Sequence, residues 1–213
     1  MNHSTGSVML ETVIALPVVL VLGFSLVQWA FVFQARAAVD HATLMAARAG
    51  SVENAQIKPM RQAFARALVA IETPEQTATD YEKQFVTQTL PEAYLHTRFK
   101  ILSPSADVFA DHGQRDKNGD TYLPFRDLDH RPDTPGPRSG LSAQQAAWLE
   151  LEITYGYKLN VPYANAMILL AAQSVSRFTS AYDRREQVML AAGRLPIKTT
   201  ATVRLQSRAK PTN

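Results

Sequence analysis

The chain of 213 residues contains no cysteine. This absence excludes a scaffold held by disulfides, a zinc site built from thiolates and a cysteine nucleophile. The motifs His-Glu-x-x-His, Gly-x-Ser-x-Gly and Gly-x-x-x-x-Gly-Lys are also missing, so no hydrolase or nucleotide-phosphate site is indicated. The mean hydropathy of −0.14 excludes a polytopic membrane protein. We therefore expect a protein that is not an enzyme, and these motifs indicate no cofactor.

Charge is missing from one long segment near the N-terminus. Between Thr12 and Phe33 no side chain is ionisable, and the 22 residues read TVIALPVVLVLGFSLVQWAFVF. A helix of this length measures about 33 Å, close to the hydrocarbon thickness of about 30 Å. The segment therefore predicts a single transmembrane helix, and a buried core helix is the alternative.

Basic residues are also absent before this segment, and Arg36 is the first in the chain. A secretory signal cleaved at Ala35-Arg36-Ala37 is a second alternative, although such signals have apolar regions of about 7–15 residues that follow positive charge. Arg36 lies on the C-terminal side of the apolar segment. Taken alone, the positive-inside rule therefore slightly favours a cytoplasmic C-terminus.

Glu11 stands at the edge of the uncharged segment, five residues after Gly6. A carboxylate in the bilayer centre costs about 2.5–3.5 kcal/mol, so one that is kept there is expected to have a partner. If the chain is cut after Gly6, Ser7 gains a free α-amine, and Glu11 becomes the fifth residue of the mature chain. Its carboxylate can then pair with the α-amine of a neighbouring subunit; a position near the head groups that reaches water is the alternative.

The N-terminal 50 residues resemble the start of the TadE-like family, the minor pseudopilins of tight-adherence (type IVb) pili. Three stretches there carry the resemblance: Glu11-Thr-Val-Ile-Ala-Leu-Pro17, Gln34–Asp40 and Ala46–Ala49. Near the C-terminus, Leu195–Leu205 resembles the closing strand of the same family. The resemblance implies that Gly6 ends a leader, that a prepilin peptidase cuts the Gly6–Ser7 bond and that Glu11 is the assembly glutamate. It also implies other pilin or pseudopilin subunits as partners. The leader departs from the family pattern because it lacks basic residues.

The first helix is expected to continue beyond the membrane. Pro17 removes one backbone donor inside the apolar segment and predicts a kink. Alanine-rich sequence after Ala35 predicts a helical stem that ends near Gly50-Ser51. The expected organisation is a leader over residues 1–6, a transmembrane and stem helix over 7–51, and an exported α+β domain over 52–213 with a loop insertion near 103–140.

The exported part is predicted to be α+β. An apolar stripe from Ile57 to Ile71 predicts a helix over 59–71, and a weaker helix over Thr79–Leu90 is expected to end at Pro91. Alternating apolar residues predict strands over 96–102, 148–159 and 197–205, which can form a small antiparallel sheet covered by helices. The apolar segment 161–172 is too short to span a bilayer and is expected to be an amphipathic helix or a cover for the sheet.

One loop has calcium-loop spacing. Oxygen ligands fall at positions 1, 3, 5, 7 and 12 of a twelve-residue loop: Asp116, Asn118, Asp120, the carbonyl of Tyr122 and Asp127. Thr121 stands where glycine is expected, and Asp127 where a bidentate glutamate is usual. The alternative is a polar, turn-rich loop, and a calcium ion here would stiffen the loop rather than take part in catalysis.

Charge is uneven along the chain. Residues 134–213 have a net charge of +6, against −3 for residues 1–133. The basic part is able to meet anionic lipid or an acidic partner, although scattered solvated charge is the preferred explanation. It lacks the dense basic and aromatic pattern of a nucleic-acid groove, so no nucleic-acid partner is expected.

Together with the family resemblance, these observations predict a pilin-like structural protein that takes part in assembling a tight-adherence pilus for surface attachment. It would lie in the bacterial inner membrane with a single span, and it could enter the extracellular pilus. The resemblance implies a periplasmic C-terminal domain, in conflict with the slight preference of the positive-inside rule. The alternative is a permanent single-span envelope protein whose exported domain binds a ligand or partner. A secreted protein released near Ala37 is a third interpretation.

Overall fold

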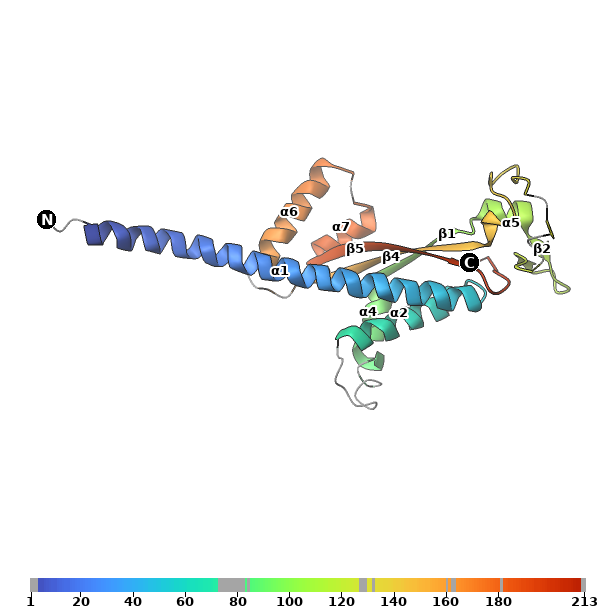
Figure 1. Ribbon diagram of the computed structural model, residues 1–213, viewed down its shortest axis with the longest axis horizontal. Helices are drawn as coiled ribbons and strands as arrows, with labels where there is room; N and C mark the ends of the chain where they lie inside the picture. Colours follow the sequence, from blue (N-terminus) through green and yellow to red (C-terminus); the bar gives the residue numbers. More distant parts are fainter. Residues whose placement is uncertain are drawn as a thin grey trace. The chain divides into compact units, whose positions relative to one another are not determined.

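The computed structural model describes residues 4–72, 83, 85–126, 130, 131, 133–159, 161, 164–180 and 182–211. The described elements follow one another along the chain as helices α1 Ser4–Val52, α2 Ile57–Glu72, π-helix η1 Phe85–Thr89 and α4 Leu90–Leu95, strand β1 Thr97–Ser103, helix α5 Ala106–His112, strands β2 Gln114–Arg115 and β3 Thr121–Tyr122, 3-10 helix η3 Gln145–Ala147, strand β4 Trp148–Lys158, helices α6 Ala164–Phe178 and α7 Arg184–Ala191, and strand β5 Arg194–Arg204. The predicted α+β class is therefore confirmed (Figure 1).

The described residues fall into two compact units. One lies within residues 1–36 and 156–196, and the other lies within residues 37–155 and 197–213. Helix α1 contributes to both units, because its first part belongs to the former and its last turns belong to the latter.

Strands β1, β4 and β5 form the small sheet that the sequence predicts, with β4 in the middle. Strand β1 is antiparallel to β4, and Phe99 lies opposite Ile153 while Ile101 lies opposite Leu151. Successive side chains of a strand point to opposite faces, so these residues share one face of the sheet. In β4 this face is buried, whereas Trp148, which the same alternation places on the opposite face, is 46% exposed.

Helix α2 and the last turns of α1 cover this face in the second unit. The Phe64 ring of α2 makes edge contacts with Phe99 and Tyr155, with ring centroids 5.5 and 6.2 Å apart. On α1, a buried hydroxyl of Thr43 hydrogen-bonds that of Thr199 in β5 at 2.6 Å. The contact of helices with one face of an antiparallel sheet therefore forms the core.

Gly50 has a packing role as well as a place near the end of α1. The helix was expected to end near Gly50-Ser51, and α1 ends at Val52, one residue later. A Cβ atom at Gly50 would collide with the Met60 side chain and approach Leu149 Cδ2 to 3.0 Å. The glycine therefore also allows α1, α2 and β4 to meet closely.

The segment after β5 closes the end of α1. The backbone N–H of Gln206 donates to the Ser51 carbonyl at 3.0 Å, and the Ser207 hydroxyl donates to the same carbonyl at 2.8 Å. The N–H of Lys210 donates to the Asn54 carbonyl at 3.1 Å. Carbonyls at a helix C-terminus lack partners within the helix, so the C-terminal segment supplies these donors from a distant part of the sequence.

The weaker helix expected to end at Pro91 is partly wrong. Residues 79–82 and 84 lie outside the described residues, and 85–89 form a π-helix. Pro91 is the second residue of α4, which continues to Leu95. A proline is tolerated in the first turn of a helix because its missing N–H would have no partner there, so Pro91 begins a helix instead of ending one.

Candidate functional site

The predicted leader junction lies at the beginning of α1. The helix starts at Ser4, so the Gly6–Ser7 peptide bond falls within its first turns. Glu11 is exposed, and no ion pair joins it to another residue of the part that the structure describes. Together with neighbours on the same helix face it lines a shallow groove of about 400 Å³, formed by Glu11, Thr12, Ala15, Leu16 and Val19. The carboxylate is thus available to a partner outside this chain.

The uncharged segment is exposed on all sides along most of its length. Large apolar side chains such as Val13, Leu22 and Leu26 are 71%, 60% and 72% exposed. Helix α1 is long and apolar enough to cross a membrane, and only 6% of its most apolar window is buried within the protein. A buried core helix, the alternative considered from the sequence, would hide this surface. The helix continues through Pro17, and the kink predicted there stays a prediction.

Gln28 is a functional candidate that was not predicted from the sequence. Its side chain is fully buried, and its Oε1 accepts a hydrogen bond of 2.8 Å from the backbone N–H of Val161. Its Nε2 is buried and has no partner among the described residues. Ser25, three residues earlier on the same helix face, bonds only within its own helix, to the Val21 carbonyl. The one signal in the sequence was this pair of polar residues, spaced three apart in an otherwise apolar stretch.

The hydrogen bond between Gln28 and Val161 joins α1 to the chain just before α6. Substitution of Gln28 is therefore expected to have a local effect on this segment. Gln28→Leu leaves the Val161 N–H without its acceptor, at a cost of about 1–3 kcal/mol for a buried donor. We expect the amides from Val161 into α6 to exchange faster with deuterium, measured by mass spectrometry on the full chain in detergent. Ser25→Ala is the matched control and should leave this exchange unchanged. Equal exchange in Gln28→Leu and wild type would contradict the assigned contact.

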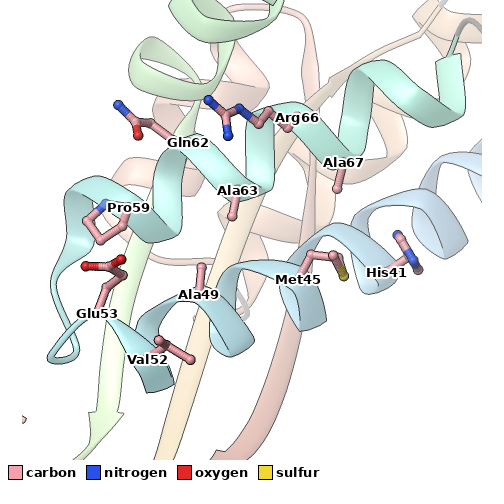
Figure 2. A pocket seen from close by; sticks show the side chains of 10 residues that line it. All are labelled: His41, Met45, Ala49, Val52, Glu53, Pro59, Gln62, Ala63, Arg66 and Ala67. Carbon is pink, nitrogen blue, oxygen red and sulfur yellow. The ribbon is translucent and has the colours of Figure 1, made fainter. Parts of the chain in front are cut away.

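A second hollow lies in the other unit, between the end of α1 and α2. It has a volume of about 670 Å³ and is lined by His41, Met45, Ala49, Val52, Glu53, Pro59, Gln62, Ala63, Arg66 and Ala67. In Figure 2, Ala49 and Ala63 face each other across the hollow, while Gln62 and Arg66 point away from it. The small side chains leave an apolar floor, and polar groups at the rim remain in solvent. This surface suits apolar side chains rather than chemistry on a polar substrate.

The candidate calcium residues lie on a small hairpin. Strands β2 and β3 are antiparallel, and the turn between them holds Asp116, Asn118 and Asp120. Asp116 Oδ1 accepts from the Lys117 N–H at 2.8 Å, and Asp120 Oδ2 lies 3.3 Å from Lys210 Nζ. Asp127 lies outside the described residues. The side chains of Asp116, Asn118 and Asp120 are exposed, and Asp120 already has Lys210 as a cationic partner.

Cationic side chains surround the far end of the hairpin. Tyr122 lines a pocket of about 170 Å³ together with Arg126, Arg131 and Arg208. The Arg208 guanidinium lies 4.9 Å from the centre of the Tyr122 ring. Positive charge near a cation site lowers its affinity for the cation, so these arginines would disfavour calcium at the loop. Calcium binding here stays a prediction.

Thermal denaturation tests the calcium loop. If its Kd is about 10⁻⁴ M, typical of weak extracellular sites, then about 10 mM Ca²⁺ adds about 2.7 kcal/mol to the free energy of unfolding. The expected rise in Tm over a chelator control is about 5–10 °C. Asp116→Ala and Asp120→Ala should abolish the rise. Lys210→Ala, which removes the ion-pair partner of Asp120 and no ligand, should keep it; an unchanged Tm of the wild type on chelation would end the calcium hypothesis.

A different carboxylate organises the adjoining loop. Asp111 of α5 accepts hydrogen bonds through Oδ2 from the Ser139 N–H at 2.7 Å, the Ser139 hydroxyl at 2.8 Å and the Arg138 N–H at 3.0 Å. These donors, led by the Ser139 backbone, lower the pKa of Asp111 below its usual value. The ionised carboxylate therefore fixes the loop after residue 135, within the insertion predicted near 103–140.

The histidines do not gather into a site within the described part. His112 Nε2 lies 2.8 Å from the Leu141 carbonyl, and His41 lines the hollow beside α2. His3 lies outside the described residues. Among the residues described, no group of three or more histidines and carboxylates is placed to hold a metal ion.

The sequence was also compared with known proteins. Residues 6–48 match the TadE-like protein family. The predicted family resemblance is confirmed for this segment, which includes Gly6, Glu11, Pro17 and the whole uncharged run, and it associates the segment with components of the tight-adherence pilus system. Neither the curated proteins nor the solved structures gave a match.

Proposed function

We propose that this protein is a minor pilin-like subunit that takes part in assembling a tight-adherence pilus. The observation that carries the proposal is the TadE-like segment at residues 6–48, which coincides with an exposed apolar helix. In this proposal α1 is the inner-membrane anchor, and the rest of the chain forms a periplasmic domain. The protein acts by assembly and not by catalysis.

Glu11 is the proposed assembly residue. It is exposed at the edge of the uncharged run and is joined by no ion pair to another described residue. After cleavage of the Gly6–Ser7 bond by a prepilin peptidase, the α-amine of Ser7 in a neighbouring subunit provides the opposite charge. A carboxylate and an ammonium group in a medium of low polarity attract strongly when they are close. The pair would therefore set the register between adjacent α1 helices.

N-terminal sequencing and intact-mass measurement test the proposed processing. In cells that have the prepilin peptidase, the mature chain should begin at Ser7. The matched control is the same chain in cells that lack the peptidase, where Met1 to Gly6 should remain, apart from any removal of Met1. A chain that keeps these residues in both cell types would contradict processing and favour the permanent single-span protein. A soluble chain beginning at Ala38 would instead support secretion.

A further inference from the structure

Helix α6 exposes an apolar face that nothing within the described part of the chain covers. Besides Ala166 near its start, its exposed residues recur at helical spacing, and all but Ser174 are apolar: Met167, Leu170, Ala171, Ser174, Val175 and Phe178. Leu170 is 65% exposed and Phe178 is 87% exposed. The opposite side of α6 is occupied, because Gln173 Nε2 donates to the Leu190 carbonyl of α7 at 3.2 Å. The apolar face is therefore outward, away from the rest of this unit.

The start of α6 is held at one end of the proposed membrane span. Val161, three residues before α6, donates its N–H to buried Gln28 of α1. Gln28 lies five residues before Phe33, about 7.5 Å along the helix axis from the end of the uncharged run. Exposed aromatic side chains, Trp29 and Phe33, lie beside it, as expected where a transmembrane helix crosses the membrane–water interface. An interfacial helix lies about 5–10 Å into this boundary, which is the depth of Gln28.

The direction and length of α6 suit a helix that lies in the interface. It diverges from α1 instead of running alongside it (Figure 1). Its 15 residues extend about 22 Å, too short for a span of about 30 Å. A helix of this length and direction fits in the plane of one leaflet.

Charge next to α6 favours anionic lipid. Helix α7 begins with Arg184 and Arg185, both exposed, and no ion pair joins either to another described residue. Basic side chains near a bilayer that contains anionic lipid contribute about 1 kcal/mol each. A second protein copy would have to associate before it could cover the apolar face. The bilayer, in contrast, is already present wherever α1 is inserted.

We infer that α6 is a membrane-interface helix whose apolar face enters the leaflet at the C-terminal end of the α1 span, with Arg184 and Arg185 against anionic phospholipid headgroups. The inference rests on α1 as a membrane span. It holds whether or not the Gly6–Ser7 bond is cut, so it can fail independently of the proposed pilus function. The contact would hold α6 and α7 against the membrane surface before the pilus is assembled.

Single-cysteine probes test the inference, since the chain has no cysteine of its own. The uncleaved full chain is placed in phosphatidylcholine nanodiscs with one copy per disc, with and without about 30% phosphatidylglycerol. An NBD fluorophore is attached at Leu170→Cys, Phe178→Cys or Val52→Cys. The last is the matched control, because Val52 is 56% exposed on the same α1 helix but lies about 28 Å beyond Phe33.

At positions 170 and 178 we expect blue-shifted emission and at least about twofold quenching by lipid with a shallow nitroxide, and at position 52 neither effect. Water-like emission at 170 and 178 in one-copy discs would overturn the inference. If blue-shifted emission appears only in discs with two copies, the face is an interface between copies and the inference is wrong. Arg184→Gln with Arg185→Gln should reduce quenching in anionic discs only, and no reduction would overturn the headgroup contact.

Discussion

Replacing Glu11 by glutamine is expected to reduce assembled pili at least about tenfold. The substitution keeps the shape of the side chain and removes the charge that pairs with the α-amine of the neighbouring subunit. A charge-assisted hydrogen bond contributes about 1.5–3 kcal/mol, equivalent to about a 10- to 100-fold change in the association constant. The measurement is the amount of surface pili sheared from cells that carry only the variant.

Two controls separate assembly from insertion. Asp40→Asn removes an exposed carboxylate from the same helix outside the uncharged run and should leave pilus yield within about twofold, as surface substitutions usually have small effects. Membrane integration of Glu11→Gln, measured by alkaline extraction, should equal that of wild type, because removing a charge eases insertion. Normal pilus yield from Glu11→Gln would favour the permanent single-span protein.

Phe64→Ala should cause the largest loss of stability in the unit formed by residues 37–155 and 197–213. Phe64 is fully buried and contacts both Phe99 of β1 and Tyr155 of β4. Truncation of such a ring costs about 3–5 kcal/mol, through lost burial and the remaining cavity. For a chain of this size that corresponds to a fall in Tm of about 6–20 °C. Circular dichroism of the full chain in detergent measures the change.

The matched control is Val86→Ala, since Val86 is 58% exposed. It should change the free energy of unfolding by no more than about 0.5 kcal/mol. Phe64→Leu should fall between the two variants because it leaves a smaller cavity. If Phe64→Ala destabilises by less than about 1 kcal/mol, the packing of α2 on the sheet is not the core of this unit.

The sequence predicted those elements whose patterns are local. The apolar stripe through Met60, Phe64 and Leu68 identified α2, and all three side chains are buried. Alternation identified β1, β4 and β5, because a half-buried strand has a period of two. Short elements were missed, among them α5, α7, β2 and β3. The helices have seven and eight residues and the strands two, which is too few for a visible period. The starts of α5 and α7 are set by N-caps at Ser105 and Asp183.

Pro91 and Gly50 show what local rules leave undecided at particular positions. Proline is compatible with the first turn of a helix as well as with its end, so Pro91 alone did not decide which applied. Gly50 matched a stop signal, and α1 ends close to it at Val52. The sequence did not show that the missing side chain of Gly50 also makes room for Met60 and Leu149, because that contact joins distant segments.

By itself the sequence determined the long apolar segment, the Gly6 and Glu11 arrangement and the α+β class. Each depends on composition and spacing within local stretches of chain, and the match at residues 6–48 agrees with the first two. Only the tertiary structure decided that Gln28 is buried against Val161 and that the apolar face of α6 stays outward. Residues 133 positions apart meet in the first case, and the second depends on which side of α6 receives α7. Neither feature produces a periodic pattern in the sequence, because each depends on packing between distant segments.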